Sequence, residues 1–431
     1  MYRKYVLLLL SALAVCANSF AVVPAIDDVS VDGRGSSVLV SYRLSGGPAI
    51  VTMELSTNGV ALPSSLMVSA NGDVARIVAN GRREIKWNSK GLLGEEAYKG
   101  DITATLKAWP LAAPPDYVVF DLSSSLPKTD THFYADANSV PGGISDDRYK
   151  TTHLLMRKIP AAGKTWHVGM PSSEVFAYSY YVYIASRSIY RPVVLTKDYY
   201  LGVYEVTQGQ CEGLYNFSDR TPGGRGTDGW QKKPMNNQFF ANVRGTTLGA
   251  QWPDETMPHN VDDGSIVKAF QNATGISSMD LPTDVQWEIA ARAGTWQNHY
   301  DGTRNYMYLS NESVLAKFKE IGWSSSNSES AVHEVGLKPA NPWGLYDMYG
   351  NVSEMCLDWF ATDSVLSDGT LQTDPKGPDS GDTRVNRGGG YNGNYNDLSS
   401  VGKSSSYPAT QRFEYMGLRL ACDADFSAFG E

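Results

Sequence analysis

The stretch NPWGLYDMYGNVSE, residues 341–354, is the most informative part of this chain. Most of its residues are small or turn-forming, which favours a rigid loop over a regular helix or strand. Asp347 and Glu354 supply carboxylates, and the backbone carbonyls of Gly350 and Val352 add neutral oxygens, which together are the ligand types that Ca²⁺ prefers. On spacing alone, a glycine-rich core loop held by its own hydrogen bonds explains the stretch equally well, because no EF-hand pattern is present.

Four further blocks accompany this stretch in a fixed order. They are YYLGVYEVT at 199–207, LPTDVQWEIAARAG at 281–294, RGGGY at 387–391 and GLRL at 417–420. Together the five blocks resemble the formylglycine-generating enzymes of the sulfatase-modifying factor family, over residues 151–424. The resemblance implies an α+β, loop-rich domain related to the C-type lectin fold, in a divergent secreted member of the bacterial type.

The position of the family's redox chemistry is the main departure from the pattern. Family members that oxidise a sulfatase cysteine use two cysteines five residues apart, and the resemblance places these positions at Gly393 and Leu398. Neither residue has a sulfur atom to bind Cu(I). No cysteine occurs at residues 357–421, so a shifted alignment does not restore the pair. We therefore expect neither a catalytic residue of the family type nor a copper cofactor.

The resemblance also implies a calcium site. The family's ligands fall on Asp347, Gly350, Val352 and Glu354, whereas the family's other calcium site is not recognisable at residues 321–328. We therefore expect one Ca²⁺. Ser353 stands where the family usually has a tryptophan beside its groove, which makes substrate binding of the family type doubtful.

The segment that follows the RGGGY block is polar and aromatic. Tyrosine with serine, glycine and asparagine is the composition of adaptable recognition surfaces, although a solvated loop without a ligand has the same composition. The candidate ligand-binding residues are Tyr391, Asn392, Asn394, Tyr395, Asn396, Asp397 and Arg412.

These observations predict a pseudoenzyme that binds a glycan or a surface protein. Two alternatives stay open. One is an oxidoreductase of the formylglycine-generating type, active in sulfatase maturation through a relocated site. The other is a lectin-like binding protein whose C-terminal loop is diversified by a retroelement.

The first 21 residues are typical of a secretory signal peptide. Arg3 and Lys4 precede an apolar run at 6–15, and a small-x-small pattern ends at Ala21. The run is too short to span a bilayer, and no other segment approaches that length, so we expect no membrane span. The mature protein is expected to be extracytoplasmic: periplasmic, on the cell surface or secreted. Lipidation at Cys16 is the alternative, and Val15 before it disfavours that modification.

Charge and cysteine content exclude further classes of protein. The formal net charge of −9, without a dense basic run, argues against a nucleic-acid partner. Cys211, Cys356 and Cys422 remain after signal cleavage and allow at most one internal disulfide. We expect Cys356 and Cys422 to form it, if any pair does. The alternative is three buried thiols.

The rest of the chain divides by pattern. Alternating strands and the turn at Asn58 and Gly59 predict a small β-sandwich of Ig-like architecture at 22–110. A proline-rich start predicts a linker or transition segment at 111–150, with one strand at 117–122, and residues 425–431 are expected to be a tail.

Local signals also place two helices and three buried acids. Capping boxes predict helices that begin after Thr207, with Gln210, and after Thr283, with Gln286. Arginines that lie in the same blocks are expected to pair with buried carboxylates. The acids are Glu205, Glu288 and Asp358, and the arginines are Arg292, Arg387 and Arg419.

Overall fold

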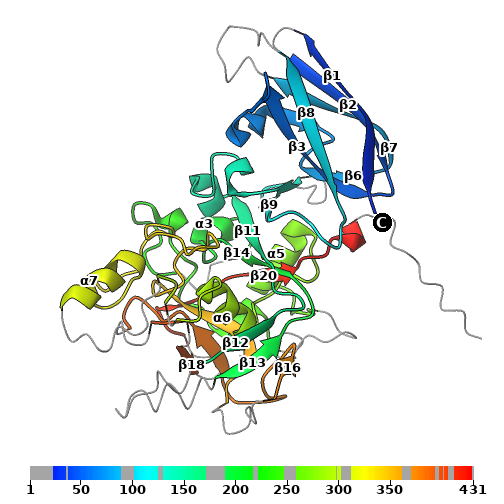
Figure 1. Cartoon of the computed structure of the whole chain (residues 1–431). Coiled ribbons are helices and arrows are strands. Elements are labelled where there is room, and N and C mark those ends of the chain that lie inside the picture. The colour runs from blue at the N-terminus through cyan, green and yellow to red at the C-terminus, as the bar shows by residue number, and fades with distance from the viewer. Residues whose placement is uncertain are drawn as a thin grey trace, which may run out of the picture.

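The computed structural model describes residues 23–34, 37–88, 101–124, 130–170, 190–216, 222–246, 259–297, 299–301, 312–361, 370–393, 398–400, 402–405 and 412–429. The predicted signal peptide lies outside these residues. Figure 1 shows two parts, an N-terminal β-sandwich and a larger, loop-rich part that contains all the α-helices drawn. No helix in the described part of the chain has the length and apolar character needed to cross a membrane.

The predicted sandwich is present. One sheet has the order β1-β2-β7-β5, and β3 joins β4, β6 and β8 in the other. Asn58 and Gly59 form the predicted turn between β3 and β4, both with positive φ. The strands are β1 (Ala25–Arg34), β2 (Ser37–Ser45), β3 (Ala49–Thr57), β4 (Val60–Ala61), β5 (Ala70–Gly72), β6 (Arg76–Val78), β7 (Gly81–Asn88) and β8 (Ile102–Trp109), with the 3₁₀ helix η1 (Ser64–Ser69).

The segment at 111–150, predicted as a linker or transition segment with one strand at 117–122, contains that strand as β9. It contributes β9 and β10 to a five-stranded sheet of order β10-β9-β11-β14-β20 in the larger part. The side chains of β9 are apolar on both faces, and Val118 and Phe120 are buried there, so this strand needs cover on both sides. The bounds are β9 (Tyr117–Asp121), β10 (Thr131–Tyr134), β11 (His153–Ile159), β14 (Tyr199–Gly202) and β20 (Ala421–Asp423), with η2 (Ala137–Ser139) and η3 (Asp147–Lys150) between β10 and β11.

Two smaller sheets complete the larger part. They have the orders β12-β13-β16 and β18-β17-β15-β19. Their strands are β12 (Thr165–Val168), β13 (Arg191–Val194), β15 (Ser353–Trp359), β16 (Gln372–Thr373), β17 (Arg384–Arg387), β18 (Lys403–Ser405) and β19 (Met416–Gly417).

Both predicted capping boxes are confirmed. Thr207 and Gln210 cap α3, and Thr283 and Gln286 cap α6, each with both reciprocal hydrogen bonds. The helices are α3 (Gln208–Cys211), α4 (Phe240–Val243), α5 (Ile266–Thr274), α6 (Asp284–Arg292) and α7 (Glu312–Ile321), with the 3₁₀ helices η5 (Trp230–Lys232) and η9 (Ser427–Phe429).

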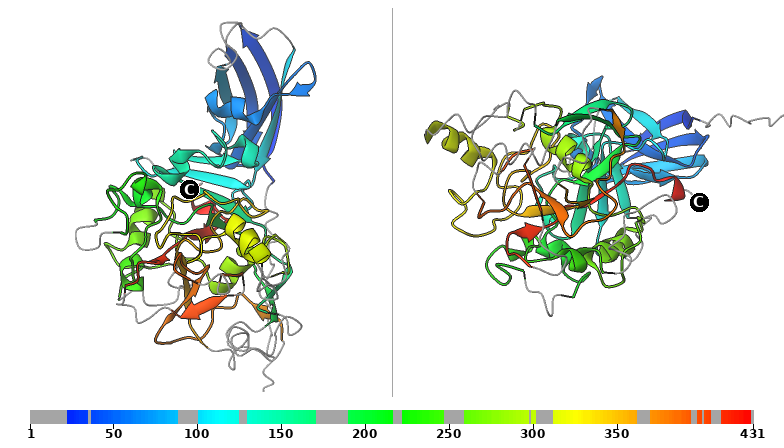
Figure 2. Two further views of the ribbon diagram at one scale, coloured as in Figure 1. Left: turned by 90° about the vertical axis from the view of Figure 1, so that its left-hand side faces the viewer. Right: turned by 90° about the horizontal axis from the view of Figure 1, so that it is seen from below.

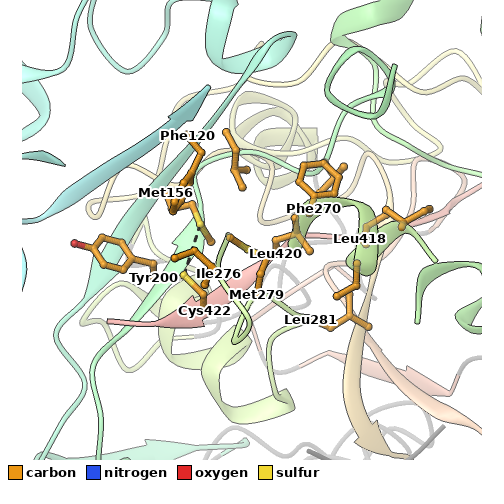
Figure 3. Close-up of a cluster of buried hydrophobic side chains, with 14 of the residues drawn as sticks. Phe120, Met156, Tyr200, Phe270, Ile276, Met279, Leu281, Leu418, Leu420 and Cys422 are labelled. Carbon is orange, nitrogen blue, oxygen red and sulfur yellow. Dashed lines mark hydrogen bonds between the residues drawn. The ribbon is translucent and has the colours of Figure 1, made fainter. Parts of the chain in front are cut away.

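The predicted Cys356–Cys422 disulfide is wrong. Both cysteines, and Cys211, are free and buried. Cys422 packs in one core cluster, where its Sγ lies 4.0 Å from Met156 Sδ (Figure 3). Cys356 belongs to a second cluster, around Trp287. The two residues lie on strands of different sheets, β15 and β20, and each thiol fills space as a small apolar group.

Candidate functional site

The 341–354 loop is anchored to the end of α6 by one asparagine. Asn341 Oδ1 accepts hydrogen bonds from the backbone N–H of Trp343 at 3.0 Å and of Leu345 at 3.1 Å. Its Nδ2 donates to the carbonyl of Ala290 at 2.8 Å. The side chain therefore closes a turn and satisfies a carbonyl in the last turn of the helix.

Gly350 permits a close crossing of two backbone segments. Its φ is +94°, and a Cβ at this position would lie only 1.7 Å from the carbonyl oxygen of Trp323. Its N–H donates to the carbonyl of Gly388 at 2.9 Å, which joins the loop to the RGGGY block. A larger side chain would force these strands of chain apart.

The next two residues of the loop bind a buried carboxylate. Glu205 accepts a hydrogen bond from Asn351 Nδ2 at 2.7 Å and from the Val352 N–H at 3.0 Å. Burial, with the nearby charges of Asp347 and Glu354, raises the pKa of Glu205 well above its ordinary value. The sequence predicted that an arginine would pair with Glu205. Instead, its two oxygens accept hydrogen bonds from the Asn351 amide and the Val352 backbone N–H.

Glu354 is fully engaged by donors in the core. Arg419 Nη2 donates to its Oε1 at 2.6 Å, Trp287 Nε1 donates to its Oε2 at 2.6 Å, and Arg419 Nε lies 3.0 Å from both oxygens. Both Glu354 and Arg419 have no exposed side-chain surface. This bidentate pair ties β15 to the segment before β20.

Asp347, a member of the predicted calcium set, has one side-chain oxygen without a hydrogen bond among the described residues. Its Oδ2 accepts from the Gly336 N–H at 2.6 Å, while its buried Oδ1 has no hydrogen-bond partner among the described residues. Burial raises the pKa of Asp347 to about 6.

The predicted ligands therefore fit a cation only in part. Asp347 offers a carboxylate oxygen, whereas Glu354 would have to leave Arg419 and Trp287 before it could bind a metal ion. Within the described ranges, no group of three or more His, Cys, Asp or Glu side chains is placed to hold a metal.

A second buried ion-pair network joins α6 to β17. Arg387 Nη2 lies 2.9 Å from Glu288 Oε2, and Arg292 Nη2 lies 2.7 Å from Glu288 Oε1, so the predicted pairing of Glu288 is confirmed. Arg387 also binds Asp284 at 2.5 Å. Asp358 instead accepts the backbone N–H of Asp284 at 2.6 Å.

The positions of the family's cysteine pair lie in a loop filled by apolar side chains. Leu398 is fully buried, and its Cδ2 would lie 2.0 Å from a Cβ on Gly389 and 3.6 Å from one on Gly393. The ring-bearing Cβ of Tyr415 would lie 2.6 Å from a Cβ on Gly390. Positions 393 and 398 are thus close together in space, but the chain's own side chains occupy the surrounding volume.

The three cysteines elsewhere in the chain are buried. Cys211 and Cys356 have no exposed surface, and Cys422 is 3% exposed. Burial raises the pKa of all three thiols above its ordinary value, which disfavours the thiolate that a metal or an oxidant would need.

The predicted ligand-binding residues separate into three groups. Tyr391 packs against Val332 and Val352 and is only 7% exposed, so it offers a ligand little surface. Asn392 and Arg412 are exposed, and the guanidinium of Arg412 lies 5.5 Å from the ring centroid of Phe239. The remaining candidates, at 394–397, lie outside the described residues.

Sequence reasoning missed an aromatic stack beside this loop. The rings of Trp323 and His333 are parallel, with centroids 3.7 Å apart, and Lys338 Nζ lies 4.1 Å from the centroid of Trp323. The Ser325 N–H donates to the Gly393 carbonyl, so this segment borders the 391–393 turn. Its only local signal was a Trp in a serine-rich stretch.

Comparison with known proteins places these blocks in one family. The model of the Sulfatase-modifying factor enzyme 1-like domain matches residues 185–424. Serine/threonine-protein kinase pkn1 of Chlamydia caviae is 34% identical over 142 residues, 33% of this chain and 20% of the kinase. Chaperone protein LppX of Paenibacillus barcinonensis is 27% identical over 254 residues, 54% of this chain and 81% of that protein. A formylglycine-generating enzyme of Streptomyces coelicolor is 31% identical over 154 residues, 34% of this chain and 48% of the enzyme.

The chain therefore spans about a fifth of the kinase and about half of the Streptomyces enzyme. The family model, by contrast, covers more than half of this chain and includes the capped helices, the 341–354 loop and the Arg419 ion pair. This protein belongs to the sulfatase-modifying factor family.

Proposed function

We propose that this protein is a catalytically degenerate, extracytoplasmic member of its family that recognises a ligand, either a glycan or a surface protein. The proposal rests on the residues that stand at the family's two cysteine positions, neither of which has a thiol. A hydrogen atom stands at Gly393, and a buried isobutyl group stands at Leu398. Without thiolates at these positions the scaffold has no soft ligands there for copper.

Two observations support a binding role. Asn392 and Arg412 are exposed, and the guanidinium of Arg412 lies over the ring of Phe239. Aromatic and arginine side chains are enriched where proteins bind partners. LppX, the relative named above in which the match covers 81% of the protein, bears the name of a chaperone, and chaperones act by binding.

The proposal includes one calcium ion at Asp347. The unpaired Oδ1 and the raised pKa of this buried carboxyl are the supporting observations, with the carbonyls of Gly350 and Val352 as further ligands. Isothermal titration of the purified protein with CaCl₂ tests it. We expect binding that Asp347→Asn abolishes and that Asp379→Asn, at a side chain 90% exposed, leaves unchanged. Equal heats for all three proteins would exclude this site.

Copper binding gives the decisive test of degeneracy. We expect purified protein to bind no stoichiometric Cu(I) and to make no aldehyde from a cysteine-bearing peptide. The double variant Gly393→Cys/Leu398→Cys is expected to gain Cu(I) binding, because the two positions are neighbours in space. The matched control is Gly393→Ser/Leu398→Ser, which has the same shape without sulfur.

Turnover by the unmodified protein would overturn the proposal in favour of a relocated oxidoreductase site. If neither activity nor copper is found, glycan-array and surface-protein binding of wild type and Arg412→Ala identify the ligand class. Unchanged binding by Arg412→Ala and Asn392→Ala would place the recognition surface elsewhere. The signal peptide is tested separately by N-terminal sequencing of protein recovered outside the cytoplasm, which is expected to begin near residue 22.

A further inference from the structure

We propose that residues 424–429 form a clasp that locks the N-terminal sandwich to the sulfatase-modifying factor domain, so that the two parts unfold as one unit. The sequence predicted a tail at 425–431, but Phe426 is 1% exposed; Ala424, the last residue of the predicted domain, is 5% exposed. In Figures 1 and 2 the C-terminal helix lies beside the end of the sandwich that faces the larger part. This inference is independent of the proposed ligand.

The clasp binds the exit of the sandwich through its backbone. The Phe426 N–H donates to the carbonyl of Leu111 at 2.9 Å, and Leu111 follows β8, the last strand of the sandwich, by two residues. Phe429 N–H then donates to the Phe426 carbonyl at 2.8 Å, which closes η9. The ring of Phe429 packs edge-on against Phe426, with centroids 5.6 Å apart.

Phe133 links the clasp to the sandwich itself. The rings of Phe133 and Phe426 meet edge to face, with centroids 4.8 Å apart, a geometry that stabilises aromatic pairs beyond their buried area. The Phe133 N–H donates to the Ala75 carbonyl at 2.8 Å, and the Ala75 N–H donates to the Val51 carbonyl at 2.7 Å. Two hydrogen bonds and one ring contact therefore connect the clasp to β3 of the sandwich.

The two parts also share a hydrophobic core. Ile50 of β3 is fully buried in the cluster that contains Phe120 and Phe426, and Ile77 and Trp109 of the sandwich pack against the same cluster. A sandwich that served as a free spacer would close its own core and leave its exit strand solvated. Here residues of both parts cover the apolar surface at the junction, and Phe426 belongs to the same cluster.

The consequence is a fixed orientation of the sandwich. Any partner that holds the sandwich would hold the sulfatase-modifying factor domain at a set angle. Loss of the clasp, by trimming of the chain before Ala424, would expose Ile50, Phe133 and their neighbours and allow the two parts to move independently. The clasp is thus a point at which proteolysis can change the protein from rigid to hinged.

Limited proteolysis under native conditions tests the clasp. The exposed Ala112 and Ala113 lie directly after Leu111 and suit a protease that cleaves after small residues. Full-length Phe426→Ala is expected to raise the rate of junction cleavage on the order of a hundred-fold, because loss of a buried phenylalanine favours the open state by that factor. Calorimetry is expected to show one transition for wild type and two for the variant. Ser427→Ala, at an exposed position of η9, is the matched control.

Each outcome decides the matter. Two calorimetric transitions in the wild type, or equal cleavage of Phe426→Ala and Ser427→Ala, would overturn the clasp. If Phe426→Ala does not fold, Phe429→Ala replaces it, since Phe429 is only partly buried. That milder variant is expected to raise junction cleavage about ten-fold, and an unchanged rate would equally overturn the inference.

Discussion

Asp358 is a buried acid whose ionisation opposes folding. It is 3% exposed, and burial together with the charge of Asp284 raises its pKa from 3.8 to about 7. A carboxyl whose pKa is higher in the folded state stabilises the fold fully below pH 3.8, and this contribution is lost as pH rises through 7. The wild type should therefore lose stability at this residue between pH 4 and pH 8.

The substitution Asp358→Asn removes this titration and keeps the key contact. The asparagine carbonyl can still accept the Asp284 N–H, which now donates to Asp358 at 2.6 Å. A pKa rise from 3.8 to about 7 corresponds to about 4 kcal/mol, at roughly 1.4 kcal/mol per pH unit. The variant's stability relative to wild type is expected to increase by about that amount from pH 4 to pH 8. Any fixed cost of the new amide is the same at both pH values and does not affect the difference.

Urea denaturation at pH 4, 5, 6, 7 and 8, followed by tryptophan fluorescence, measures this difference. Asp284 does not add to this pH dependence. Arg387 and Lys403 lower its pKa, so it stays ionised between pH 4 and pH 8. Asp379→Asn, at a 90% exposed side chain, serves as the control and should show no such trend. A stability difference between Asp358→Asn and wild type that does not vary with pH would refute the reasoning.

Three further predictions follow from the core contacts. Glu354→Gln is expected to destabilise the protein by about 3–5 kcal/mol in urea, because it leaves the Arg419 guanidinium buried without its counter-charge; a loss under about 1 kcal/mol would contradict this role. Gly350→Ala should destabilise the protein by more than about 3 kcal/mol, because the added Cβ would meet the Trp323 carbonyl. The control Gly59→Ala adds a Cβ that meets no atom, and at a φ of +78° it should cost only about 1–2 kcal/mol. Equal losses of stability in the two variants would count against the close crossing at Gly350. Cys211, Cys356 and Cys422 are expected to react with a thiol reagent only after unfolding, and rapid modification of any one in the native protein would show that the core opens there.

Local features were predictable because their causes lie within a few residues. Thr207 with Gln210, and Thr283 with Gln286, form their capping boxes within one turn, so sequence spacing alone determines them. The turn at Asn58 and Gly59 and the alternating strands around it depend on equally local rules. The five ordered blocks predicted the family, and the match of the family model to residues 185–424 confirms it.

The absence of cysteines from the family's loop is likewise a fact of sequence, and it needs no structure to state. What occupies the volume around that loop is a fact of tertiary structure. The sequence shows that Leu398 is apolar and Tyr415 aromatic, but it does not show what they contact. Only the fold places Leu398 against Gly389 and Tyr415 against Gly390.

The partners of the buried charges were decided by the fold. Glu354 meets Arg419 across 65 positions of the chain, and Glu205 meets Asn351 across 146. Composition shows that acids and arginines are present, but which pair forms depends on which groups lose water together and lie within hydrogen-bond reach. For the same reason the segment around Phe426, which looks like a tail, becomes core, and β9, predicted only as a strand within a transition segment, is covered on both faces. Their apolar side chains find cover only when strands from distant parts of the sequence are brought beside them.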